Sequence, residues 1–163
     1  MGEAMQDPHR EFLRHVVATL AYRGGKVLRD APEGLATLRI SDASRTPVEI
    51  LGHIGDLFEW AHSIARGEEA WPGDTEPRWE LQVERFYGGL ARLEEVLASD
   101  APLRAPAEKL FQGPLADALT HVGQLAMLRR LVGTPVRGEN YFRADIGAGR
   151  VGRDQAAPRR EFD

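Results

Sequence analysis

The stretch Asp117-Ala-Leu-Thr-His121-Val-Gly-Gln124-Leu-Ala-Met-Leu128-Arg-Arg130 is the best starting point for predicting the fold. Asp117 and His121 stand four residues apart, so on a helix their side chains lie one above the other. The same stripe passes through Gln124 and then becomes apolar, at Leu128, Leu131 and Val132. Because the polar end of the stripe continues into apolar residues, the stripe is expected to face the hydrophobic core. The stretch therefore predicts a helix with a carboxylate and an imidazole on its inward face.

An earlier helix is predicted to carry a second inward histidine, His53. Thr46 suits the N-cap of this helix, Pro47 its first position, and Glu49 the position where a capping-box acid belongs. The helix is expected to end near Gly67. Its inward stripe consists of Ile50, His53, Ile54, Leu57, Ala61 and Ile64. His53 is thus predicted to face the helix that carries Asp117 and His121.

Two further stretches have apolar residues at helical spacing. The first runs from Arg10 to just before Pro32, and we predict one helix that can bend at Gly24-Gly25, because each glycine costs about 1 kcal/mol relative to alanine. The second runs from Trp79 to Leu97 with alternating steps of four and three residues. That alternation is typical of helices in a bundle.

These helices predict an all-α fold, an antiparallel four-helix bundle with an ordered C-terminal extension. The fourth helix is expected from Pro114 to about Val132, and residues 99–112 are expected to be a linker. No strand is predicted. The chain is interpreted as one domain, 1–163, with the bundle over about 10–132. In an up-down-up-down order, the second and fourth helices would run parallel and lie diagonally across the core.

The segment after the fourth helix, about 133–155, is rich in glycine and is predicted to be an ordered cover. Its large apolar residues would be unusual in a disordered tail: Tyr141, Phe142, Ile146 and Val151. We expect residues 138–146 to pack back on the bundle. The last residues, from Arg159 to Asp163, are expected to be loose.

Composition narrows the function classes. A net charge of −4 argues against a general nucleic-acid binder, which needs a basic surface. The absence of cysteine excludes a disulfide, a thiolate metal ligand and a cysteine nucleophile. No apolar run approaches the roughly 20 residues of a membrane span, and the first residues lack a signal-peptide core. We therefore expect a cytoplasmic protein with no membrane partner.

His53, Asp117 and His121 together form a candidate three-ligand metal site. Two imidazoles and a carboxylate suit zinc, nickel or iron and leave positions open for water or substrate. The alternative is a set of hydrogen-bonded core residues without a metal. The candidate pocket residues are Glu49, Asp56, Gln124, Glu139 and Tyr141. Four arginines either hold an acidic ligand or neutralise the helix end: Arg129, Arg130, Arg137 and Arg143.

The segments 46–60 and 121–130 resemble the second and fourth helices of the DinB family, the DinB/YfiT-like metal-dependent proteins. The resemblance covers about residues 10–132. It implies that His53 and His121, the latter followed by Gly-Gln124, bind a divalent metal, most often nickel or zinc. Family members carry a histidine four residues before the one that His121 matches, whereas this chain has Asp117. The related thiol-dependent maleylpyruvate isomerases have a carboxylate there, so the resemblance still implies Asp117 as a ligand.

The resemblance also implies a metal-dependent enzyme that acts on a small molecule. It would be either a low-molecular-weight-thiol-dependent S-transferase or isomerase, or a hydrolase. The thiol would be a cofactor, because the chain has no cysteine. The alternative is a non-catalytic, metal-binding or dimeric stress-related scaffold. A homodimer is expected, with Trp71 and Trp79 as candidate interface anchors.

Overall fold

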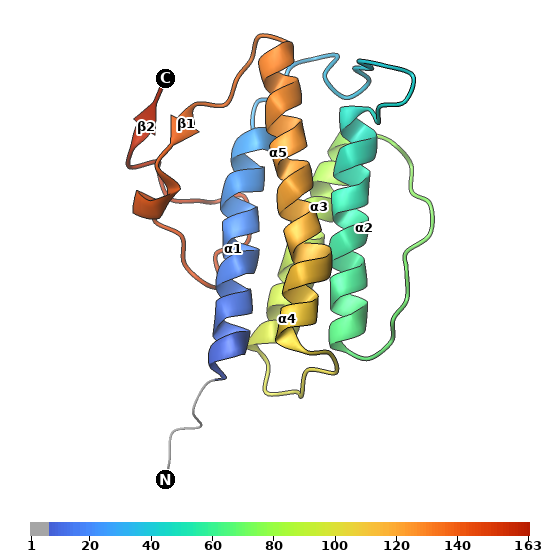
Figure 1. Cartoon of the computed structure of the whole chain (residues 1–163), viewed down its shortest axis with the longest axis vertical. Helices are drawn as coiled ribbons and strands as arrows, with labels where there is room; N and C mark the ends of the chain where they lie inside the picture. The colour runs from blue at the N-terminus through green and yellow to red at the C-terminus, as the bar shows by residue number, and fades with distance from the viewer. Residues whose placement is uncertain (1–6) are drawn as a thin grey trace.

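A computed structural model describes residues 7–163, which are mostly helical and include a short two-stranded antiparallel sheet (Figure 1). An all-α fold with four long helices is therefore confirmed. The elements are α1 (Pro8–Leu28), α2 (Pro47–Ala65), α3 (Trp79–Ala98), α4 (Ala107–Leu110), a π-helical turn (Phe111–Leu115), α5 (Ala116–Leu131), β1 (Gly138–Glu139), a 3-10 turn (Tyr141–Arg143) and β2 (Glu161–Phe162).

The start of α2 is fixed by the capping box that the sequence predicts. The Thr46 hydroxyl accepts a hydrogen bond from the Glu49 N–H, and the Glu49 carboxylate accepts one from the Thr46 N–H at 2.7 Å. Pro47 occupies the first helical position, where a missing N–H costs nothing. These interactions satisfy donors that a helix start would otherwise leave unpaired. They fix where along the chain α2 begins, and hence the position of His53 within it.

The direction of the helices differs from the up-down-up-down prediction. Gly52 lies against Gln82, and Gly89 lies against Phe58, so α2 and α3 run parallel. The helix α5 instead runs antiparallel to α2 and directly beside it (Figure 1). The predicted diagonal arrangement of the second and fourth helices is therefore wrong. Residues 66–78 allow the parallel pair, because their extended length of roughly 43 Å exceeds the roughly 28 Å length of α2.

One hydrophobic core joins the four long helices. It includes the fully buried Phe58 and Phe86, whose rings meet edge to face at a centroid distance of 5.4 Å. The helix α1 runs unbroken through Gly24-Gly25. The glycine pair lies against Phe86 and Tyr87 of α3, so its role is close packing. No helix among residues 7–163 combines the length and apolar character that a membrane crossing would need.

Helical structure before α5 begins earlier than predicted. Residues 107–115, most of which fall in the predicted linker, form α4 and the π turn. Pro114, which has no N–H to donate, lies within this wide turn. Leu110 and Leu115 are both buried although they stand five residues apart. The turn therefore keeps the core face continuous from α4 into α5.

The C-terminal extension is ordered and packs along α1 (Figure 1). The prediction of no strand is wrong in one place, because β1 pairs with β2 and Gly138 lies opposite Phe162. Glu139, fully buried, accepts hydrogen bonds from the Tyr22 hydroxyl at 2.6 Å and from Lys26 Nζ at 2.7 Å. Lys26 also pairs with Glu161, so residues after Arg159 do have contacts.

Candidate metal centre

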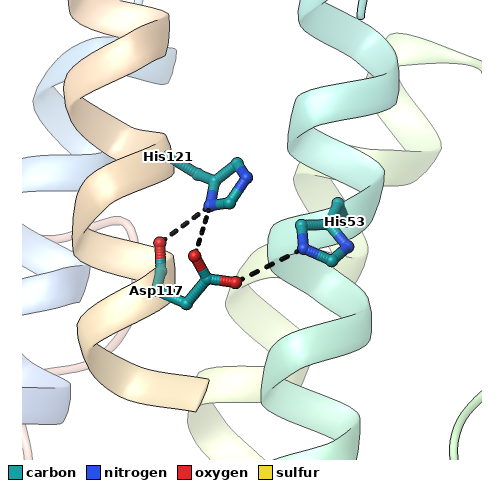
Figure 2. A group of neighbouring side chains, drawn as sticks. All are labelled: His53, Asp117 and His121. Carbon is teal, nitrogen blue, oxygen red and sulfur yellow. Dashed lines mark hydrogen bonds and ion pairs between the residues drawn. The ribbon is translucent and has the colours of Figure 1, made fainter. Parts of the chain in front are cut away.

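Two adjacent helices bring together the three predicted ligands. His53 comes from α2, and Asp117 and His121 come from the first two turns of α5. One ligand atom from each side chain lies within 4.8 Å of the other two. Figure 2 shows the Asp117 carboxylate between the two imidazoles, with Oδ2 at 3.5 Å from His53 Nε2 and Oδ1 at 3.3 Å from His121 Nδ1. The group could hold a metal ion.

A backbone hydrogen bond orients the His121 ring. Its Nδ1 lies 2.8 Å from the carbonyl oxygen of Asp117, one turn earlier in α5. A carbonyl oxygen only accepts, so Nδ1 is the donor of this bond and Nε2 is the ring nitrogen that remains for a metal ion. Metal-binding histidines commonly hold one ring nitrogen in this way. The bond thus prepares the Nε2 atom of His121 to coordinate a metal ion.

Spacing and burial both suit a metal ion. The 3.5 Å between His53 Nε2 and Asp117 Oδ2 is close to the roughly 3.3 Å expected between two ligands of a tetrahedral ion. The histidine side chains are 21% and 12% exposed, and that of Asp117 is 45% exposed. Burial, with the Arg45 cation and the neighbouring His121, lowers the pKa of His53. His53 is therefore neutral at pH 7, and the open carboxylate leaves a path for a small molecule.

Trp71 contacts the site, although the sequence suggested it only as an interface anchor. Its ring centroid lies 6.0 Å from that of His53 and 5.6 Å from that of Trp60. Trp71 belongs to the long segment that leads from α2 to α3, and its side chain is half exposed. The sequence feature that could have linked Trp71 to the site is its position shortly after the helix that carries His53. Trp71 therefore shields one side of His53 from water.

Two cavities border the group, one at His121 and the other at Asp117. The first, of about 400 Å³, is lined by His121 and by Gln124, one of the predicted pocket residues; we call it the α5 groove. Its lining consists of Ile40, Ser44, Arg45, Ile50, His121, Gln124, Met127, Leu128 and Leu131. The second, of about 440 Å³, touches Asp117 and is lined also by Leu57, Trp60, Gln112, Gly113, Ala116 and Thr120. Space for small molecules thus exists beside His121 and beside Asp117.

Four other predicted pocket residues have different contacts. Glu49 belongs to the α2 cap, and Asp56 pairs with Arg85 of α3 at 2.8 Å. Glu139 is bound to α1, and Tyr141 lies edge-on to Tyr22 at 6.3 Å. None of the four borders either cavity. The structure therefore places these four residues away from the cavities beside His121 and Asp117.

The predicted arginine cluster is also dispersed. Arg129 is buried and donates to the backbone carbonyls of Val27 and Arg29, at 2.9 and 2.6 Å. It therefore satisfies backbone carbonyl groups at the C-terminal end of α1. Arg137 pairs with Glu161 in the extension. The cation that does border the site is Arg45, which the sequence analysis did not identify.

Comparisons with protein-family models, with curated proteins and with solved structures found no match to this chain.

Proposed function

We propose that this protein is a divalent-metal-dependent enzyme with a four-helix bundle of the DinB type. His53, Asp117 and His121 would hold zinc or nickel. The observation that carries the proposal is the convergence of the three side chains, from two helices far apart in the chain, to within 4.8 Å. The segments 46–60 and 121–130, which resemble the family, are those that contribute these side chains.

The three residues would share the work of binding. His53 and His121 supply neutral nitrogen ligands, and Asp117 supplies one negative charge. When bound, a divalent ion would supply Lewis-acid chemistry and lower the pKa of a water molecule or a low-molecular-weight thiol. Trp71 limits the access of water to His53. Gln124, beside His121, can orient a small-molecule substrate through its amide.

Two reactions fit this site, thiol transfer or isomerisation, and hydrolysis. The two cavities, one beside His121 and one beside Asp117, favour the thiol reactions, because a thiol and an electrophile need separate places next to one centre. Hydrolysis needs only one organic substrate. The chain has no cysteine, so the thiol would enter as a cofactor.

The alternative proposal is a non-catalytic scaffold, in which the three side chains only bond to one another and the chain forms a homodimer. The half-exposed carboxylate of Asp117 argues against it, because a structural ion pair at a solvent-open position contributes only about 0–1 kcal/mol. Light scattering on the purified protein measures the oligomeric state directly.

Metal content tests the enzyme proposal against the scaffold. Elemental analysis of the purified protein should find about one zinc or nickel ion for each chain, and His53→Ala should lose it. His62→Ala is the matched control, because His62 lies on the same helix outside the group and should leave the metal content unchanged. Equal metal content in wild type and His53→Ala would overturn the proposal.

A further inference from the structure

The α5 groove combines an apolar wall with a cationic end. Ile40, Met127 and Leu131 are each more than half exposed, and all three line this one cavity. Ile50 and Leu128, both buried, complete the apolar lining. Exposed apolar side chains that share one concave surface indicate a binding site. The cavity volume of about 400 Å³ falls in the roughly 300–1,000 Å³ range of small-molecule pockets.

The polar lining of the groove lies next to the candidate metal centre. Along α5 the lining residues follow in the order His121, Gln124, Met127 and Leu131. Ten residues of helix separate the first from the last, which is roughly 15 Å. The groove is therefore polar at the end near Asp117 and apolar at the end near Leu131.

Arg45 gives the groove a positive charge. It is exposed, it lines the groove together with His121, and it forms no ion pair within residues 7–163. An arginine without a carboxylate partner can bind a carboxylate of a ligand through two hydrogen bonds.

We propose that the α5 groove binds a small amphipathic carboxylate, with the carboxylate at Arg45 and the apolar chain along Met127 and Leu131. This inference rests on the proposed function, because it identifies the small-molecule substrate as an amphipathic carboxylate. Two neutral histidines, one aspartate and a divalent ion carry a net charge of +1, which adds to that of Arg45. Zinc should therefore strengthen binding of the anion.

Calorimetric titration with octanoate tests the proposal, with octanol and octylamine as probes of the same chain length. Octanoate should bind more tightly than either, and the Met127 methyl signal should shift in NMR spectra. Arg45→Gln should weaken octanoate binding about tenfold or more, because it removes a charged hydrogen-bond donor. Arg66→Gln makes the same charge change at the other end of α2 and should have no effect.

Leu131→Asp tests the apolar end. It should weaken octanoate binding at least tenfold, because it places a carboxylate beside the alkyl chain. Phe142→Asp, at an exposed apolar residue outside the groove, should leave binding unchanged. Equal octanoate affinity in wild type, Arg45→Gln and Leu131→Asp would overturn the proposal, as would equal affinity for octanol.

The same titration in metal-free and zinc-loaded protein separates this inference from the proposed function. Zinc binding without octanoate binding would overturn the groove assignment and leave the metal site standing. Octanoate binding that depends on Arg45 and Leu131 in a protein that takes up no zinc would support the groove and overturn the metal site.

Discussion

Nε2 of His53 lies 3.5 Å from Oδ2 of Asp117, although the two residues come from antiparallel helices. The same carboxylate reaches His121 one turn further along α5. Asp117 therefore connects the two imidazoles, and its removal should disturb both. The first residues to substitute are therefore His53, Asp117 and His121.

Cobalt titration of the metal-free protein should separate ligands from neighbours. His53→Ala and His121→Ala should each weaken cobalt binding by more than the roughly 10–100-fold that an outer-shell change costs. Asp117→Ala should have a comparable effect, because Glu49 is held in the α2 cap and cannot replace it. The visible cobalt spectrum reports binding, and His62→Ala provides the control. An unchanged affinity in His121→Ala would remove that residue from the site.

The pKa of His53 in the metal-free protein should lie below the ordinary value of about 6.5. Burial is the largest cause, and Arg45 is the next. In the pH range just below 6.5 the unfolded chain then binds more protons than the folded chain. Stability should therefore be full above pH 6.5 and fall as the pH drops through the folded pKa. NMR titration measures the pKa, and Arg45→Gln should raise it. A His53 pKa that does not change in Arg45→Gln would contradict the assigned cause.

The buried Glu139 should stabilise the docking of the extension on α1. Burial raises the pKa of Glu139, but hydrogen bonds from Lys26 and Tyr22 outweigh that effect and lower it. Glu139→Ala should cost about 3–5 kcal/mol, because it leaves the Lys26 ammonium with fewer partners. Deletion of residues 138–163 should likewise lower the melting temperature in circular dichroism.

Asp145→Ala is the control for Glu139→Ala within the same extension. Its partner is Arg159, at the surface, so its loss should cost less than about 1 kcal/mol. Equal melting temperatures for Glu139→Ala and Asp145→Ala would show that the buried pair contributes no more to stability than the surface pair.

Two glycine substitutions should have opposite effects on stability. A Cβ at Gly24 would collide with the Phe86 ring, so Gly24→Ala should destabilise the fold by about 1–3 kcal/mol. A Cβ at Gly123 would meet nothing within 4 Å, so Gly123→Ala should stabilise α5 by up to about 1 kcal/mol. Urea unfolding measures both. Stabilisation by Gly24→Ala would show that α1 and α3 are less closely packed than described.

Local sequence signals predicted the four long helices that the structure contains. The cap at Thr46 involves residues three apart, so it can be identified without tertiary information. The four-residue spacing of Asp117 and His121 likewise fixes their relative placement on one helix. Their proximity to His53 could be predicted because each candidate lies on a stripe with apolar neighbours.

Interactions between distant parts of the chain could not be predicted in the same way. Apolar stripes specify which face of a helix is buried but not its direction, so the parallel pairing of α2 with α3 was missed. In the sequence, Glu139 looks like an ordinary polar residue of a loop. Its partner Lys26 lies 113 residues earlier, so the pair is recognised only in the folded chain. The α5 groove depends on Arg45 and Leu131, which belong to segments that only the fold brings together.

The π turn at 111–115 amounts to one additional residue within an otherwise regular helix. Each residue of an α-helix advances the side-chain direction by roughly 100°. Phe111, before α5, contacts Phe12 of α1, whereas His121 faces His53 of α2. Deleting one residue from this turn would restore regular winding and rotate Asp117 and His121 away from α2. The phase of the helix, set by a single inserted residue, thus determines whether the three side chains meet.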